Sequence, residues 1–118
     1  MNRPKEFLAW AVKTFGPIAL DRDERMDRFL EEAIELAHAA GVGRLHVNRI
    51  INRVYDRPAG DIIKEVGQAQ ACLECYAESI GLSSDAEATK EFERVQSIPQ
   101  AEWTRRHQAK VDLGIARN

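Results

Sequence analysis

Apolar residues recur at helical spacing along nearly the whole chain, and the strict alternation typical of half-buried strands is absent. Six runs of this kind, separated by Gly, Pro or Ser, cover about residues 4–15, 22–40, 45–57, 61–80, 85–98 and 100–113. The connections between the runs are only a few residues long. This pattern predicts an all-α protein, an antiparallel helical bundle of about five to six helices joined by short loops.

The fourth run has the most regular apolar stripe, with steps of four and three residues in alternation. Its members are Ile62, Val66, Ala69, Leu73, Tyr76 and Ile80. A stripe of this width predicts a helix that packs against a partner helix. The second and third runs carry shorter stripes, which include Phe29 and Val54, and we expect these stripes to face the core as well.

Composition limits the domain count and the class of protein. The 118 residues, 44% of them hydrophobic, suit a single domain over 1–118, with the first helix within 1–16 and a C-terminal helix and tail in 100–118. No apolar stretch is long enough to span a membrane. The formal net charge of −2 disfavours non-specific nucleic-acid binding. Two cysteines and a start without the layout of a secretory signal favour a reducing cytoplasm.

Three glutamates on the second run form the main candidate for chemistry. Glu31, Glu32 and Glu35 are spaced three and four residues apart, so their carboxylates project from neighbouring parts of one helical face. Like charges at this spacing destabilise a helix by about 0.2–0.5 kcal/mol per pair, and a bound Mg²⁺ removes that repulsion. The alternative is a solvated acidic face without a ligand.

A further acid on the fourth run strengthens the metal hypothesis. Glu65 lies beside the apolar stripe of its helix, so two helices packed through their stripes can direct it toward Glu32 and Glu35. These positions resemble the motif of the MazG-like group of all-α nucleotide pyrophosphohydrolases, Glu-Glu-x-x-Glu followed by Glu-x-x-Asp. Further matching segments are Phe15-Gly16-Pro17, Arg28-Phe29-Leu30, Arg57-Pro58-x-Gly60 and Glu93-Arg94-Val95.

The resemblance implies a hydrolase that cleaves a nucleoside triphosphate to a monophosphate and pyrophosphate with Mg²⁺, or with Mn²⁺ as a substitute. It assigns Glu32, Glu35 and Glu65 as metal ligands, with Gln68 at the remaining ligand position. Glu31 would position water or act as the base. It further implies phosphate contacts from Lys90 and Arg94, and assembly as a homodimer or homotetramer.

Gln68 departs from the motif, because related enzymes carry Asp there. A neutral amide oxygen can contact one cation but cannot bridge two or supply negative charge. Asp61, which shares the helix face of Glu65, is a possible substitute, but at the helix start an N-cap role is favoured. The substitution supports a second hypothesis, a catalytically impaired relative that binds nucleotide or a protein partner without turnover. A helical interaction module without a ligand is a third.

The remaining chemically distinctive residues favour structural roles. Arg49, Arg53 and Arg57 recur every four residues as a basic ridge, which is expected to be a solvated face although it could meet a triphosphate or a neighbouring subunit. The pair Cys72 and Cys75 is expected to be two buried structural thiols within a helix. For Trp10 and Trp103, core or interface packing is favoured over stacking on a base. The lone His38 is expected at the surface or its boundary.

Overall fold

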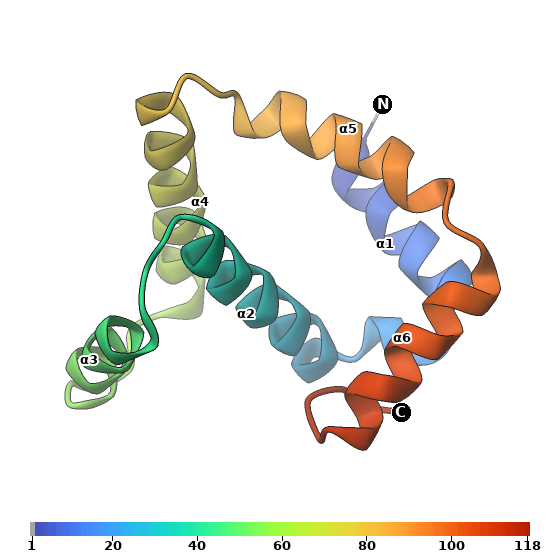
Figure 1. The fold of residues 1–118 in the computed structure, drawn as a ribbon, viewed down its shortest axis with the longest axis horizontal. Helices are drawn as coiled ribbons and strands as arrows, with labels where there is room; N and C mark the ends of the chain where they lie inside the picture. Colours follow the sequence, from blue (N-terminus) through green and yellow to red (C-terminus); the bar gives the residue numbers. More distant parts are fainter. Residues whose placement is uncertain (1) are drawn as a thin grey trace. The chain divides into compact units, whose positions relative to one another are not determined.

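The structure is a computed structural model that describes residues 2–118, and all regular structure in that range is helical. Figure 1 shows six α-helices and one 3₁₀ helix: α1 (Arg3–Phe15), η1 (Pro17–Leu20), α2 (Arg22–Ala39), α3 (Arg44–Tyr55), α4 (Ile62–Ser79), α5 (Ser84–Gln96) and α6 (Gln100–Asp112). The predicted all-α class and the six segments are confirmed. Within residues 2–118, none of the helices is both long and apolar enough to cross a membrane.

Local capping explains where the helices begin. The side chain of Asn2 accepts from the Lys5 amide at 3.2 Å at the start of α1. Asp61 accepts from Lys64 at the start of α4, and the Ser83 hydroxyl accepts from the Ala86 amide at 3.1 Å before α5. Each side-chain oxygen satisfies a backbone donor that has no carbonyl partner inside the helix. The boundaries therefore agree with the predicted runs to within about two residues.

The 3₁₀ helix η1 was not predicted. Gly16 ends α1 with a φ of 83°, a left-handed conformation that glycine adopts without steric cost. Pro17 then supplies a φ suited to a first helical turn, and four residues suffice for one 3₁₀ turn. A four-residue segment is too short to show a hydrophobic period in the sequence.

The chain divides into two compact units. The first, unit 1, combines the residues up to Leu36 with Thr89–Asn118 and holds α1, η1, α6 and most of α2 and α5. The second, unit 2, is Ala37–Ala88 and holds α3 and α4.

Unit 1 is organised around aromatic side chains. Trp10 of α1 packs edge-on against Trp103 of α6, with ring centroids 5.2 Å apart, and Phe15 contacts both rings at 5.9 Å. Figure 1 shows α1 (blue) beside α6 (red). A second pair, Phe7 and Phe92, joins α1 to α5 at 4.8 Å. Edge-to-face pairs add roughly 0.5–1.5 kcal/mol each beyond their buried area, so these contacts fix the three helices against one another.

Glu24 is the most deeply buried charged side chain of unit 1, with 1% of its surface exposed. Its carboxylate accepts from the Arg117 backbone amide at 2.7 Å and lies 3.4 Å from the Arg28 Nε. Arg28 also donates to the Ile115 carbonyl. A buried carboxylate is tolerated only when it is paired and hydrogen-bonded. Here Arg28 of α2 supplies the charge and the Arg117 amide supplies the hydrogen bond.

Unit 2 exposes the apolar stripes that were expected to face a core. Ala77 is the single buried residue in the range 37–88, and α3 has none. On α4, Ile62 is 78% exposed and Val66 65%. Within unit 2 the expectation that these stripes face inward is wrong, because α3 and α4 leave them uncovered. Within unit 1, Phe29 of α2 is likewise 54% exposed.

Candidate functional site

The three α2 glutamates lie on adjacent turns of one uninterrupted helix in unit 1. The helix begins one residue after Asp21, whose carboxylate accepts from the Glu24 amide at 2.9 Å. From that start, helical geometry places Glu31, Glu32 and Glu35 near the middle of α2, where backbone groups are paired internally. Their carboxylates are therefore free to engage side chains and ligands instead of the helix backbone.

Glu31 is held by two basic side chains. Arg28, one turn earlier on α2, places its Nη1 3.3 Å from a carboxylate oxygen of Glu31. Lys110 of α6 brings its Nζ to 2.8 Å from the same oxygen. Because Arg28 also pairs with the buried Glu24, the orientation of Glu31 is linked to the packing of the C-terminal residues.

Glu32 and Glu35 interact directly as two carboxyl groups. The pKa of Glu32 is raised above its usual value of 4.5, first by partial desolvation and then by the charge and hydrogen bonding of Glu35, while Lys110 opposes the shift. Two neighbouring carboxyl groups resist being ionised at the same time, so one of them keeps its proton more readily. A cation at the pair would relieve the same repulsion.

Arg94 and Lys90, the predicted phosphate-binding residues, both lie on the part of α5 that belongs to unit 1. The Arg94 Nε donates to Glu91 at 2.8 Å, and this pair lowers the pKa of the Glu91 carboxyl. The pKa of Arg94 is raised chiefly by Glu91 and to a smaller extent by Glu32. Arg94 therefore lies within electrostatic range of the α2 acids.

Glu65 and Gln68 lie on the first turns of α4 in unit 2, and both are exposed. A Cβ atom placed on Gly60 would come within 2.7 Å of the Glu65 Oε1, so the carboxylate bends back over the loop before the helix. Asp61 caps α4 through the Lys64 amide at 3.3 Å. The N-cap interpretation of Asp61 is thus confirmed.

The donor set on α2 suits a hard cation. Mg²⁺ prefers oxygen ligands and is commonly held by one or two carboxylates, with water and phosphate oxygens completing its shell. Glu32 and Glu35 provide two such carboxylates on one helix face. Among residues 2–118, no group of three or more His, Cys, Asp or Glu side chains comes together as a metal site.

Sequence analysis missed two neighbours of the acids, Arg28 and Lys110. The spacing of Arg28 and Glu31, three residues on one helix, is a recognisable signal for a pair. Lys110 is distant in sequence and reaches Glu31 only because α6 folds beside α2 within unit 1. The pocket found in unit 1, about 360 Å³, is lined by Leu8, Ala19, Leu20, Arg22, Arg25 and Met26, and none of the three glutamates borders it.

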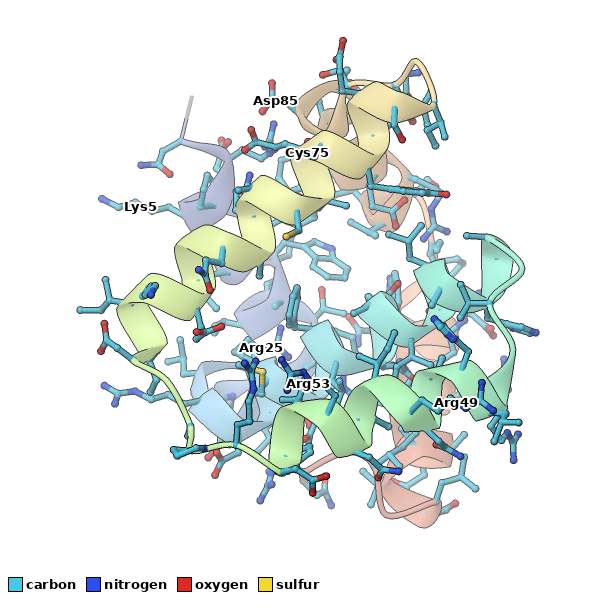
Figure 2. All side chains as sticks on the ribbon, turned by 90° about the vertical axis from the view of Figure 1, so that its left-hand side faces the viewer. Lys5, Arg25, Arg49, Arg53, Cys75 and Asp85 are labelled. Atoms are coloured by element: carbon cyan, nitrogen blue, oxygen red, sulfur yellow. The ribbon has the colours of Figure 1, made fainter. Side chains whose placement is uncertain are left out.

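For the other distinctive residues, the structure corrects one expectation and confirms several. Cys72 and Cys75 are free and exposed, so the expectation of buried thiols is wrong; α4 has little of its surface covered within the chain. The packing role of the two tryptophans is confirmed by their ring contact. The arginine ridge is exposed, and Figure 2 labels Arg49 and Arg53 along α3. His38 is also exposed.

Comparison with known proteins identifies no relative: no family model, curated protein or solved structure matches the chain.

Proposed function

We propose that the protein is a Mg²⁺-dependent nucleotide pyrophosphohydrolase that converts a nucleoside triphosphate to a monophosphate and pyrophosphate. The observation that carries the proposal is the Glu32–Glu35 carboxyl pair on α2. The pKa of Glu32 is raised first by partial desolvation and then by the charge and hydrogen bonding of Glu35. The resemblance of the acidic motif to the MazG-like enzymes supports the same chemistry. The enzyme would work in the cytoplasm as a homodimer or homotetramer.

In this proposal Glu32 and Glu35 hold the cation, and the resemblance adds Glu65 and Gln68. Bound Mg²⁺, or Mn²⁺ in its place, would supply charge neutralisation for the phosphates and acidify the attacking water. Glu31 accepts the proton of that water as the general base. Its ion pairs with Arg28 and Lys110 hold its carboxylate in one orientation.

Basic residues of α5 would bind the phosphate chain of the substrate. Arg94 pairs with Glu91 by two hydrogen bonds. An incoming phosphate would replace the Glu91 carboxylate as the anion bound to Arg94. Lys90 lies one turn earlier on the same helix. A guanidinium can grip phosphate oxygens through two parallel donors, so Arg94 would fix the orientation of the chain.

Gln68 favours a second candidate function, nucleotide or partner binding without turnover. An amide oxygen contributes no charge to the cation, so Mg²⁺ is held more weakly than in a set with Asp at that position. Nucleotide binding can proceed with a more weakly held metal ion than hydrolysis requires. The two candidates share the site and differ in whether the anhydride bond is broken.

A nucleotide panel with Mg²⁺ or Mn²⁺ tests the proposal, with phosphate and pyrophosphate measured separately. We expect pyrophosphate release from at least one triphosphate, abolished in Glu35→Gln and retained in Glu74→Gln, which changes an exposed acid elsewhere on α4. Metal-dependent nucleotide binding without any release would select the second candidate. Absence of both metal and nucleotide binding would leave only a helical interaction module.

A further inference from the structure

We propose that the cavity between α1, η1 and α2 binds an aliphatic carboxylate, an unbranched acyl chain that ends in a single carboxylate group. The cavity has a volume of about 360 Å³, and all of its lining residues belong to unit 1. They are Leu8, Ala19, Leu20, Arg22, Arg25 and Met26. Because none of the acids of the proposed hydrolase borders this cavity, the site is separate from the proposed function.

The apolar wall of the cavity suits a flexible chain. Ala19 is fully buried, whereas the side chains of Leu8, Leu20 and Met26 are between 41% and 59% exposed, so the cavity is accessible from solvent. None of the lining side chains is an aromatic ring that could stack on a planar ligand. A methionine adapts to irregular shapes, and the volume lies in the range of about 300–1,000 Å³ that is typical of small-molecule sites. An aliphatic chain would cover these three exposed side chains.

Two arginines supply the polar part of the cavity. Arg25, labelled in Figure 2, has its Nε buried without a hydrogen-bond partner among residues 2–118. A buried donor of this kind destabilises the fold until an acceptor reaches it, and a ligand oxygen can be that acceptor. Arg22, the first residue of α2, is exposed and therefore accessible to the same ligand. Guanidinium groups bind carboxylates through parallel donors, so both residues favour an anionic head group.

The balance of charge favours a carboxylate over a phosphate monoester. The Nη2 of Arg25 lies 3.7 Å from the Oε2 of Glu24, whose side chain is buried. Part of the positive charge of Arg25 is therefore already balanced within the protein. A dianionic phosphate placed against Arg25 would be repelled by the Glu24 carboxylate, whereas a single negative charge would be repelled less. The lining thus combines an aliphatic wall with room for one negative charge.

Isothermal titration of the full chain with straight-chain carboxylates, kept below their micelle-forming concentrations, tests the site. We expect one octanoate to bind per chain. From butanoate to octanoate, each added CH₂ should tighten binding by up to about fourfold. 1-Octanol, which has the same chain without the charge, should bind at least about tenfold more weakly than octanoate. Octyl phosphate should also bind more weakly than octanoate.

Substitutions at the two parts of the cavity separate their contributions. Arg25→Gln, and Arg22→Gln at an exposed position, should each weaken octanoate binding by about tenfold and leave 1-octanol binding unchanged. Arg49→Gln, at an exposed arginine of α3, is the matched control for charge. Leu20→Asp should abolish binding of both ligands, with Leu113→Asp, at a residue that is 74% exposed in unit 1, as its control. Circular dichroism verifies that each variant keeps its helix content.

Three results would overturn the proposal. The first is an octanoate that fails to bind the wild type or binds no more tightly than 1-octanol. The second is equal affinity for butanoate and octanoate, because the apolar wall would then contribute nothing. The third is an octanoate affinity that Arg22→Gln and Arg25→Gln both leave unchanged. The titrations contain neither nucleotide nor Mg²⁺, so their outcome is independent of whether the proposed hydrolysis takes place.

Discussion

Unit 1 and unit 2 use similar proportions of apolar residues to very different effect. In unit 1 the aromatic rings of α1, α5 and α6 contact one another, and Glu24 is buried with its partners. In unit 2 the equally regular stripes of α3 and α4 remain exposed. Helical periodicity therefore specifies which face of a helix must be buried, but it does not specify which element or partner covers that face.

The largest contrast between the units should come from an aromatic truncation. Trp103→Ala removes ring contacts with Trp10 and Phe15 and a hydrogen bond to the Val95 carbonyl, so we expect a loss of about 3–4 kcal/mol in unfolding free energy. Tyr55→Ala in unit 2, at a side chain that is 82% exposed, should change stability by less than about 0.5 kcal/mol. Urea unfolding compares the two, and equal losses would remove the distinction.

Removing the buried acid should follow closely. Glu24→Gln leaves Arg28 without its buried countercharge and weakens the hydrogen bond to the Arg117 amide, which should cost about 3 kcal/mol. Glu78→Gln, at an exposed acid of α4, is the control and should be nearly neutral. Faster amide exchange at Arg117 in the first variant would locate the effect, and an unchanged exchange rate would contradict it.

The metal response tests each acid of the proposed ligand set separately. At a concentration of about 100 times the dissociation constant, Mg²⁺ would add about 2.7 kcal/mol to stability. We expect Glu35→Gln in unit 1 and Glu65→Gln in unit 2 each to abolish this gain while helix content stays constant in circular dichroism. A variant that melts with the full Mg²⁺ shift would remove its residue from the proposed ligand set.

Restoring an acid at position 68 should have a smaller effect. Gln68→Asp adds a negative oxygen donor next to Glu65 on α4, and we expect Mg²⁺ to bind about tenfold more tightly. Isothermal titration measures the change, with Gln70→Asp on the same helix as the control. Weaker binding in Gln68→Asp would show that this side chain does not meet the cation.

The smallest expected effect is a gain in stability without metal. The pKa of Glu32 is raised in the folded state, so folding favours the protonated carboxyl. The free energy of unfolding therefore falls as the pH rises through the folded-state pKa of Glu32. Glu32→Gln should therefore stabilise the Mg²⁺-free protein by about 0.2–0.5 kcal/mol at neutral pH. Near pH 3 the two proteins should unfold alike, because the wild-type carboxyl is then protonated in both states. A gain that persists at that pH would need another cause.

Sequence alone predicted the helices well because their determinants are local. Asn2, Asp61 and Ser83 cap helices by bonding backbone donors three residues ahead, and such spacings can be recognised in a linear pattern. The local grouping of the α2 glutamates is equally readable. The exposure of Cys72 and Cys75 was missed because burial depends on what lies against α4, which its own periodicity does not encode.

The surroundings of the acids could not be predicted in the same way. Lys110 reaches Glu31 from a helix near the other end of the chain. The bond between Glu24 and the Arg117 amide spans 93 residues. Contacts of this range arise from the packing of whole helices, and a single sequence contains no local spacing that reports them.

The long reach from Glu24 to Arg117 also sets an order of events during synthesis. The first 36 residues leave the ribosome well before residues 89–118, which complete unit 1. At about 5–20 residues per second, synthesis of the intervening segment takes several seconds, and during that time the nascent α1 and α2 lack the rest of unit 1. Unit 1 is therefore expected to fold only after residues 89–118 have emerged, and its apolar rings stay open to chaperones until then.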